Sequence, residues 1–590
     1  MIKKETFSAA KSPLSWSPEA MEALRIMNET GENLFLTGRA GTGKSTLLTE
    51  FRKQTRKRVA VLAPTGVAAV NVGGQTIHSF CGFKPDITLK KVKRLGDDNK
   101  KVKVLRRLDT IIVDEISMTR ADILDCFEKF LRLNRRSKGG DQAGNPGGSS
   151  GRSSGGSSYG DLPFGGIQMI FIGDLYQLPP VVTSNEKHAF ETLYKSPYFF
   201  DAKSFDHDRF HFIELEKVYR QSDGNFIRLL NSIRNNSVGD AEFAELNVRY
   251  EAGAEEGEYG GKENPAKEAR RKASRGVNVG ILDSRKVGKG KVGKTTEGKF
   301  KVCLTSTNAK ATEINEANLR ELLGDESVFT ARITGRFDRS HMPTDQVLRL
   351  KDGAQVMLLN NDAEGRWVNG TMGVIDEVNG YEGITVRLET GESYVVTENE
   401  WDVFEYRVES GALKTSTIGS FSQYPLKLAW ALTIHKSQGK TFDEVVIDLG
   451  RGTFAHGQLY VALSRCRTLG GITLRQPLRK RHVIMDWRVV RFVTALQYAK
   501  SEETCSIDER VGIIEKAIAS GSALSITYLK NNDEKSRRVI EPQKIGEMEY
   551  KGAKYLGVEA FCRLRRSVRV FRVDRMLQIK EGGGGCSQLE

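Results

Sequence analysis

The sequence is poor in cysteine and in long apolar runs. Its 590 residues include 7 cysteines, scattered without a CxxC pair, which argues against a disulfide framework or a zinc site. No apolar run approaches the roughly 20 residues that span a bilayer, and the first residues, MIKKETFSAAKSPLSW, lack the apolar core of a secretion signal. These absences predict a soluble intracellular protein with no membrane partner.

Positive charge, by contrast, is in excess. Lys and Arg outnumber Asp and Glu by 90 to 75, which gives a net charge of +15. This favours a polyanionic partner, because Lys and Arg gain affinity by displacing counterions from phosphates. The charge alone also fits a merely soluble basic protein. The chain is too long for one hydrophobic core, so we expect two to four domains.

The first part of the chain, residues 1–250, predicts an α/β lobe. Short β-branched runs alternate with helical stretches over residues 33–135, which is typical of a parallel sheet with crossover helices. A Gly/Ser-rich stretch at 137–160 predicts a flexible loop. Residues 251–300 predict a flexible basic linker, with a phosphate-tracking arm as the alternative.

A second α/β unit is expected over residues 301–500. Strand-like segments separated by Gly and Asn predict a β-rich insert in it at about 355–424. Residues 508–580 predict a separate small α+β piece, and residues 581–590 a flexible end.

GRAGTGKS, residues 38–45, is a complete GxxxxGK[ST] loop between a predicted strand and a predicted helix. Its backbone N–H groups can cradle phosphates at the helix N-terminus. Lys44 is expected to reach the β- and γ-phosphates and Ser45 to bind Mg²⁺, so ATP and Mg²⁺ are the predicted cofactors. The residues expected to line the nucleotide here are Gly38, Ala40, Gly41, Thr42, Gly43, Lys44, Ser45 and Thr46.

An acidic pair follows the apolar strand TIIV. Asp114 can hold the metal shell and Glu115 can polarise the attacking water. Such a pair is common after strands, and the upstream phosphate loop is what makes it indicative. Asp174 and Gln177 in GDLYQLPPV could sense the γ-phosphate.

Phosphoryl transfer also requires cations for the charge that spreads over the phosphate oxygens. Arg220 in LEKVYRQ and Arg465 in YVALSRCR are the candidates. A surface salt bridge is the alternative for each arginine taken singly.

Seven motifs occur in the order typical of superfamily 1B helicases: GRAGTGKS, APTGVAA with GGQTIHSF, IIVDEIS, GDLYQLPPV, LEKVYRQ, LTIHKSQGKTFD and YVALSRCR. PFGGIQ, residues 163–168, is specifically similar to the PIF family, relatives of the RecD helicases. The resemblance covers residues 16 to about 495. It implies two RecA-like P-loop lobes and an ATP-dependent 5'-to-3' DNA helicase of DNA replication, repair, recombination or telomere maintenance.

The resemblance assigns roles to individual positions. It implies catalytic roles for Lys44, Glu115, Gln177, Arg220 and Arg465, and contact with the nucleotide from the second lobe for Gly439 and Arg465. The residues that resemble DNA-facing positions are Pro64, Thr65, Gly66, His78, Ser79, Phe80, His435, Lys436, Ser437 and Gln438.

The resemblance also implies accessory elements: an SH3-like fold for the insert at 355–424 and a duplex-splitting wedge at about 83–107. Base stacking needs exposed rings, for which His78, Phe80 and Trp367 are candidates, with a core position as the alternative for each. Ala20 stands where the family has an adenine-reading Gln, which predicts a broad nucleotide preference.

The tail resembles a WYL domain, a small Sm-like module of bacterial regulators. Its pattern RLRRSVRVFRVDR predicts Val568, Val570, Phe571 and Val573 partly inward, and an anion-binding face that includes Arg563, Arg565, Arg569 and Arg575. A solvated strand face is the alternative. The tail indicates a bacterial source and a cytoplasmic, nucleoid-associated protein.

The expected partners are single-stranded DNA and fork or tailed duplex DNA, with G-quadruplex DNA as a further candidate, bound by a chain that is monomeric when free. A protein-stripping translocase is the alternative within the same mechanistic class. A transcription regulator whose WYL tail senses a ligand is the alternative from another class. The lack of a recognisable helix-turn-helix segment argues against the regulator.

Overall fold

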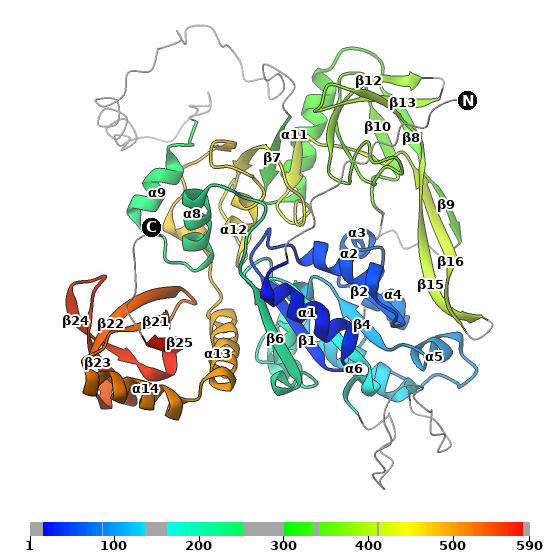
Figure 1. The fold of residues 1–590 in the computed structure, drawn as a ribbon. Helices are drawn as coiled ribbons and strands as arrows, with labels where there is room; N and C mark the ends of the chain where they lie inside the picture. Colours follow the sequence, from blue (N-terminus) through cyan, green and yellow to red (C-terminus); the bar gives the residue numbers. More distant parts are fainter. Residues whose placement is uncertain are drawn as a thin grey trace, which may run out of the picture.

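The computed structural model describes residues 16–84, 86–135, 162–182, 184–251, 300–335, 342–380, 382–409, 412–550 and 552–581. The predicted Gly/Ser loop at 137–160, residues 252–299 of the predicted linker and residues 582–590 of the predicted tail lie outside the described residues. The described chain forms two parallel sheets, antiparallel strands beside the second sheet, and a separate C-terminal antiparallel sheet (Figure 1).

The first sheet, with its helices, is called the first lobe. Its strand order is β3-β2-β4-β5-β1-β6 and all pairings are parallel. The strands are β1 (Asn33–Gly38), β2 (Val59–Ala63), β3 (Gln75–Thr76), β4 (Thr110–Val113), β5 (Gln168–Ile172) and β6 (Phe210–Leu215). The α-helices are α1 (Pro18–Glu29), α2 (Lys44–Gln54), α3 (Gly66–Asn71), α4 (Ile77–Cys81), α5 (Lys100–Leu105), α6 (Ala121–Arg135), α7 (Ser184–Leu193), α8 (Gly224–Arg234) and α9 (Asp240–Asn247).

Both faces of this sheet are buried, which explains the unbroken apolar runs of its strands. Leu34 and Leu36 of β1 pack in a cluster with residues of α1 and α2, whereas Phe35 lies on the other face, its ring 5.5 Å from that of Phe199. The parallel strands end at one edge, and the loops that follow β1, β4 and β5 carry the predicted chemistry. Ligands of open α/β sheets bind at this edge.

The second parallel sheet, with its helices, is called the second lobe, and its first strand in the chain begins at Lys301. Its strand order is β18-β7-β19-β20. Its strands are β7 (Lys301–Thr305), β18 (Ala431–Thr433), β19 (Glu444–Asp448) and β20 (Ile472–Leu474). Its helices are α11 (Asn308–Glu321), α12 (Gln458–Leu463) and α13 (Trp487–Thr504).

Antiparallel strands interrupt the second lobe between α11 and β18. They begin with β8, before the expected start at residue 355. The long hairpin β15–β16 extends toward the first lobe, where α5 lies against β15 (Figure 1). The strands are β8 (Ser327–Thr330), β9 (Arg332–Gly335), β10 (Val347–Leu350), β11 (Gln355–Leu358), β12 (Met372–Gly380), β13 (Gly383–Leu388), β14 (Ser393–Val396), β15 (Asn399–Glu409), β16 (Ala412–Gln423) and β17 (Leu426–Leu428).

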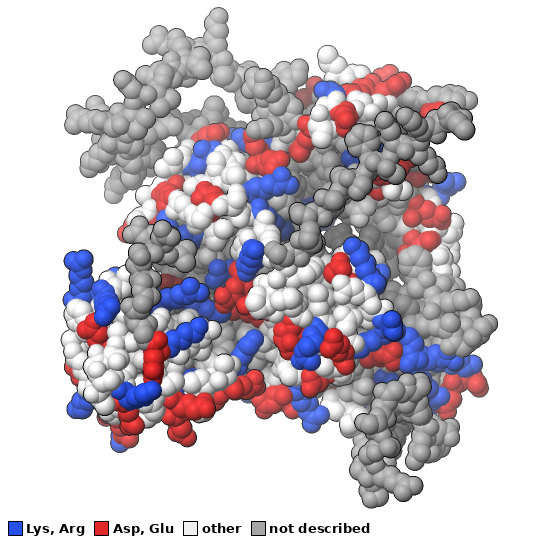
Figure 2. All heavy atoms as spheres, viewed as in Figure 1, with Lys and Arg blue, Asp and Glu red and all other residues white. Residues whose placement is uncertain are grey.

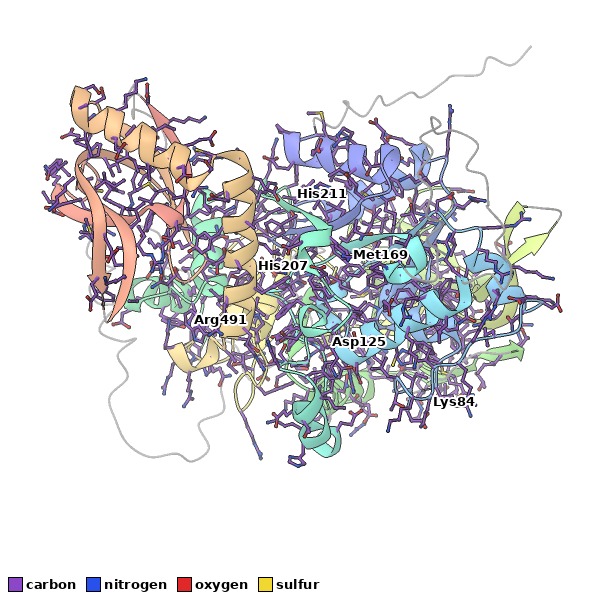
Figure 3. All side chains as sticks on the ribbon, turned by 90° about the horizontal axis from the view of Figure 1, so that it is seen from below. Lys84, Asp125, Met169, His207, His211 and Arg491 are labelled. Atoms are coloured by element: carbon purple, nitrogen blue, oxygen red, sulfur yellow. The ribbon has the colours of Figure 1, made fainter. Side chains whose placement is uncertain are left out.

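The C-terminal part packs α14 (Ile507–Ser520) on a five-stranded antiparallel sheet of order β24-β23-β22-β21-β25. In Figure 3, α13, which carries Arg491, stands between this sheet and the first lobe; it contacts both β6 and β25. The strands are β21 (Leu524–Leu529), β22 (Lys535–Tyr550), β23 (Ala553–Cys562), β24 (Ser567–Arg572) and β25 (Met576–Glu581).

The prediction for the last strands is half right. Phe571 and Val573 are buried, but Val568 and Val570 are each 48% exposed. The two valines pair with Phe561 and Glu559 of β23, whose side chains lie on the face turned away from the buried cluster. Strand alternation therefore places both valines outside, where the sequence had suggested core.

Candidate active site between the two lobes

The phosphate-binding loop joins β1 to α2 at the edge where the strands end. Gly41 and Gly43 have φ angles of 82° and 86°, in the left-handed region that favours glycine. A Cβ on Gly41 would lie 2.5 Å from the Cβ of Arg220, so the glycine allows this arginine to pack against the loop. Gly43 is the N-cap of α2 without a side-chain cap, which makes the first N–H groups of the helix available to an anion.

Lys44 begins α2 and its ammonium group folds back over the loop. Its Nζ donates to the carbonyl oxygens of Gly38 (2.6 Å) and Arg39 (3.0 Å). Burial lowers the pKa of Lys44, while the carboxylates of Asp174 and Glu115 act in the opposite direction. The ammonium group is therefore held among loop carbonyls that a phosphate oxygen could replace.

The other predicted nucleotide residues surround Lys44. Ala40 and Thr42 are buried in the loop, and Thr42 Oγ1 donates to the carbonyl of Arg39 at 2.9 Å. Ser45 and Thr46 are exposed on the first turn of α2, so the Ser45 hydroxyl is accessible to a metal ion.

Asp114 and Glu115 lie directly after β4, beside the phosphate-binding loop. Burial raises the pKa of Asp114, and burial together with the charge of Asp114 raises that of Glu115 to about 7. Gln438 of the second lobe donates through Nε2 to Glu115 Oε2 at 3.1 Å. One of the residues predicted to face DNA therefore contacts the predicted catalytic base.

The two predicted arginines reach the site from different lobes. Arg465 follows α12 and is 1% exposed; it is held by the carbonyl of Val461 (Nε, 2.9 Å) and the hydroxyl of Ser464 (Nη2, 2.8 Å). Arg220 follows β6, and its Nη1 donates to the carbonyl of Ser464 at 3.4 Å. Gln221 adds bonds to the carbonyls of Ser464 (3.2 Å) and Cys466 (3.0 Å). The arginines thus meet where the lobes touch.

The charges of this site fit a metal-bound triphosphate. The pKa of Arg465 is lowered to about 9, mainly by burial and secondly by the positive charge of the neighbouring Arg220. A polyanion would stabilise the charged arginines, and a divalent cation would stabilise the ionised forms of Asp114 and Glu115. The buried arginines thus match the triphosphate of ATP, and the buried carboxylates match Mg²⁺.

The GDLYQ segment after β5 contacts the second lobe directly. Asp174 is fully buried and accepts from Gln177 Nε2 at 3.2 Å. His456 Nε2 lies 3.1 Å from the carbonyl oxygen of Leu175, and a Cβ on Gly457 would lie 2.2 Å from the carbonyl oxygen of Tyr176. A change at Asp174 can therefore reach the second lobe through backbone contacts.

Two further residues were not found from the sequence. Tyr460 of α12 accepts a hydrogen bond from the backbone N–H of Ala40 at 3.0 Å, which joins the lobes. Phe454 is 63% exposed and stacks on His435, with ring centroids 6.1 Å apart and planes 12° apart. Tyr460 is the first residue of the YVALSRCR motif, and Phe454 lies six residues before it, in a stretch with several glycines.

The residues predicted to face DNA divide into accessible and buried ones. Pro64, Thr65, His78, Ser79 and His435 are half-buried, and Lys436 and Gly439 are exposed. Gly66 and Ser437 are buried.

Phe80 and Trp367 are buried, so the expectation that their rings stack on bases is wrong. Phe80 packs in the core against Phe127, with ring centroids 6.4 Å apart. Trp367 is 6% exposed, and its Nε1 donates to Asn360 Oδ1 at 3.0 Å. Neither ring is available for base stacking, because each fills a hydrophobic cluster.

Charge is mixed on the surface. On the face shown in Figure 2, Lys and Arg are interspersed with Asp and Glu and do not form a single basic field. In the C-terminal sheet, Arg565 and Arg569 are exposed, and Arg563 pairs with Glu541 at 2.8 Å. The net positive charge therefore does not by itself locate a DNA path.

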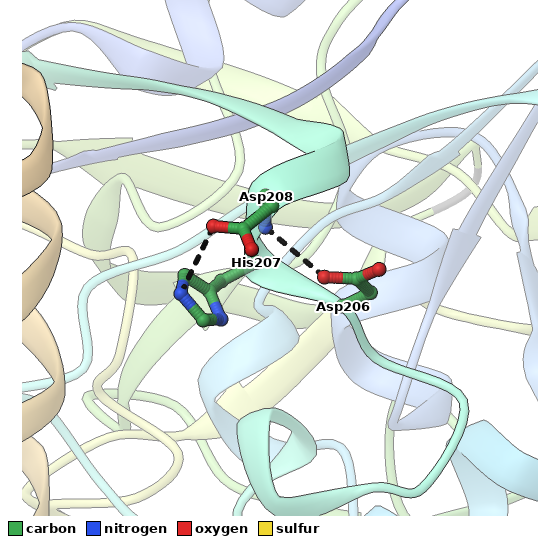
Figure 4. A group of neighbouring side chains, drawn as sticks. All are labelled: Asp206, His207 and Asp208. Carbon is green, nitrogen blue, oxygen red and sulfur yellow. Dashed lines mark hydrogen bonds and ion pairs between the residues drawn. The ribbon is translucent and has the colours of Figure 1, made fainter. Parts of the chain in front are cut away.

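One cluster of metal-ligating side chains lies on the surface, away from the nucleotide site. Asp206, His207 and Asp208 bring ligand atoms within 4.8 Å of one another (Figure 4). Asp206 pairs with Arg209 at 3.0 Å, and His207 contacts Asp208 at 3.1 Å. These exposed contacts account for the geometry without a metal.

Two expectations from composition can be compared with the described residues. The six described cysteines are all free. None of the described helices is both long and apolar enough to cross a membrane.

Known proteins resemble the chain in three segments. Residues 19–242 match the PIF1-like helicases, residues 428–471 the UvrD-like helicase C-terminal domain, and residues 509–581 the WYL domain. The first and third matches agree with the resemblances seen in the sequence.

Relatives extend over most of the chain. The ATP-dependent DNA helicase PIF1 of Rattus norvegicus is 33% identical over 519 residues, covering 86% of this chain and 68% of that protein. The ATP-dependent DNA helicase Pif1 of Bdellovibrio bacteriovorus is 30% identical over 482 residues, covering 81% of this chain and 91% of that protein. The crystal structure of Bacteroides sp. Pif1 with ADP-AlF4 matches with a TM-score of 0.64 at 32% identity, covering 81% of this chain and 96% of that one. The chain therefore belongs to the PIF1-like helicase family, whose members are ATP-dependent DNA helicases, and it carries a WYL domain after its second lobe.

Proposed function

We propose that the chain hydrolyses ATP to move 5' to 3' along single-stranded DNA and to unwind duplex DNA ahead of it. The observation that carries this proposal is that Glu115 of the first lobe accepts a hydrogen bond from Gln438 of the second lobe and lies within reach of the charges of both Lys44 and Arg465. A site divided between two lobes changes when they open and close, so hydrolysis can be converted into movement. A Bacteroides sp. Pif1 structure with ssDNA, at 32% identity and a TM-score of 0.53, supports the same substrate.

In this mechanism Lys44 and the backbone N–H groups of α2 bind the phosphates. Ser45 and Asp114 would hold Mg²⁺, which supplies neutralisation of charge on the phosphate oxygens when bound. Glu115 accepts a proton from the attacking water. Arg220 and Arg465 stabilise the charge that develops on the transferred group.

Gln177 and Asp174 pass the state of the nucleotide to the second lobe. Asp174 sits in the GDLYQ loop, which packs on Gly457. Gly439, exposed after Gln438, contacts the nucleotide from the second lobe in this proposal. Closure of the nucleotide site then moves the second lobe, and the DNA-facing segments of that lobe move with it.

The DNA path is proposed to follow the accessible candidates of both lobes. Pro64 and Thr65 follow β2, and His78 and Ser79 lie on α4. In the second lobe, His435 and Lys436 lie beside the exposed Phe454 ring, which offers a platform for a base. The same loop carries Gln438, which contacts Glu115, so DNA contact and catalysis are joined there. We retain Gly66 and Ser437 only as backbone contacts, because both are buried.

The accessory parts are assigned from their position. We propose that residues 83–107 form the wedge, because α5 in this segment meets β15 of the insert. The insert is proposed to be SH3-like and the C-terminal sheet Sm-like. Arg563 and Arg565 are proposed to add a site for single-stranded DNA. The protein is proposed to be bacterial, associated with the nucleoid, and monomeric when free. A structure of Pif1 helicases at forked duplex DNA supports forks as substrates.

The direct test is strand displacement with ATP and Mg²⁺ on matched duplexes that carry either a 5' or a 3' single-stranded tail. Unwinding from the 5' tail alone, lost in Lys44→Ala while DNA binding persists, is the expected result. If DNA stimulates hydrolysis but neither duplex is unwound, the chain is a translocase and the helicase proposal is withdrawn. Truncation after about residue 500 separates a motor, which keeps unwinding, from a regulator, which loses its output.

A further inference from the structure

A turn of the WYL domain enters the first lobe beside the GDLYQ segment. The turn, residues 530–534, joins β21 to β22. Its Asp533 is 4% exposed and has a φ of 60°, a conformation uncommon outside glycine and asparagine-like residues. Aspartate is rarely buried to this extent unless another group pairs with it.

The partner of Asp533 is Arg234, the last residue of α8. Arg234 Nη1 lies 3.5 Å from Asp533 Oδ2, and Nη2 lies 3.8 Å from Asp174 Oδ1. Its guanidinium lies over the ring of Tyr176, 3.8 Å from the centroid. All three charged side chains are at most 2% exposed. One buried cation therefore connects a carboxylate of the WYL domain to a carboxylate of the GDLYQ segment.

Neighbouring contacts fix the turn in this position. Lys535 Nζ lies 2.7 Å from Glu214 Oε2 and 2.5 Å from Glu216 Oε1, at the end of β6. Asn532 Nδ2 donates to the carbonyl of Asn235 at 3.3 Å. The chain after β6 leads directly to Arg220, so the start of β22 contacts one of the segments that deliver residues to the nucleotide site.

Asp533 carries its carboxyl group in a buried position. Burial raises its pKa to about 6, although Arg234 acts in the opposite direction. The folded state therefore holds the proton more tightly than the unfolded chain, and stability falls as pH rises from about 4 to 6. The ion pair with Arg234 offsets this cost, so the buried charge of Asp533 depends on the position of Arg234.

We propose that Arg234 is a positioning residue for Asp174. In this proposal the WYL domain fixes the position of the Arg234 guanidinium through Asp533 and so controls the rate of ATP hydrolysis. Arg234 is shared between two carboxylates. Without the charge of Asp533, it would move fully onto Asp174 and compete with the bond from Gln177. This proposal rests on the role of Asp174 proposed above. Because coupling is reciprocal, a partner that moves the turn would change the nucleotide site, and the nucleotide would change the turn.

The test is steady-state ATP hydrolysis by the full chain with saturating single-stranded DNA, for Asp533→Asn and for Lys535→Met. Asparagine keeps the size of the side chain, and Arg234 keeps Asp174 as a charged partner, so Asp533→Asn is expected to fold. Lys535→Met removes the pairs with Glu214 and Glu216 and so loosens the turn, while Asp533 and Arg234 are both kept. We expect kcat to fall about 5-fold or more in both variants, with KM for ATP within about 2-fold of wild type.

The matched control is Glu547→Gln, which removes an exposed carboxylate from the same strand, β22; its partner Lys554 lies 2.8 Å away. This variant should keep wild-type kcat and KM, and it and Asp533→Asn should keep the wild-type melting temperature within a few degrees. Wild-type kcat in both Asp533→Asn and Lys535→Met overturns the coupling while leaving the motor intact. If wild-type chain shows no DNA-stimulated hydrolysis, the proposed function fails and this inference fails with it.

Discussion

Removing one hydroxyl between the lobes should slow ATP hydrolysis. Tyr460 is 3% exposed, and its Oη accepts the backbone N–H of Ala40 at 3.0 Å. In Tyr460→Phe this N–H stays buried without a partner when the lobes are closed, whereas water satisfies it when they open. The cost therefore falls on the closed state, in which Arg465 of the second lobe is proposed to reach the phosphates.

The size of the effect follows from that single bond. A buried polar group left without its partner costs about 1–3 kcal/mol. At 1.4 kcal/mol for each factor of ten, this corresponds to a loss of about 5- to 150-fold in the closed population. Because phenylalanine keeps the ring, the hydrophobic packing of α12 is preserved.

The assay is DNA-stimulated ATP hydrolysis measured as kcat and KM. Tyr394→Phe is the control, because Tyr394 Oη donates to Glu392 at 2.7 Å in an exposed bond within the insert that does not join the lobes. Its kinetics should not change. If Tyr460→Phe also keeps kcat and KM within 2-fold of wild type, the closed arrangement of lobes is not the one that hydrolyses ATP.

Three further predictions follow from the site. Arg465→Lys keeps the charge but loses the forked hydrogen bonds, so single-turnover hydrolysis should fall about 10³-fold while nucleotide binding persists; an unchanged rate would remove Arg465 from catalysis. Phe454→Ala should weaken binding of single-stranded DNA by about 1–3 kcal/mol in fluorescence anisotropy, and unchanged affinity would exclude the ring as a base platform. With Ala20 buried in α1 where the family has an adenine-reading glutamine, GTP and ATP should be turned over at similar rates. A strong preference for ATP in the same assay would contradict that expectation.

The sequence was sufficient to predict strands, helices and loops that are determined by neighbouring residues in the chain. The strands before the phosphate-binding loop and before Asp114 are short apolar runs, and parallel strands end at one edge, so the spatial grouping of their loops could be predicted. The arginines were found because hydrolysis requires cations there. The structure brings both to Ser464: Arg220 donates to its carbonyl oxygen and Arg465 to its hydroxyl.

Contacts between distant segments could not be predicted. Phe80 and Trp367 were considered as base platforms, but a ring's exposure depends on what packs on it, and both lie in cores. Val568 and Val570 belong to a short strand with apolar residues on both faces, so alternation did not reveal which face is covered. The pairing of Arg234 with Asp533 joins residues 299 positions apart, and only the docking of the WYL domain creates it.

The central claim is that ATP hydrolysis between the lobes drives movement toward the 3' end of single-stranded DNA. Stopped-flow translocation tests it most directly, with a fluorophore placed at either end of oligonucleotides of increasing length. We expect an ATP-dependent signal from the 3' label, with a lag that grows in proportion to length and disappears in Lys44→Ala. A lag that grows with length for the 5' label, or a signal that does not require ATP, would contradict the account.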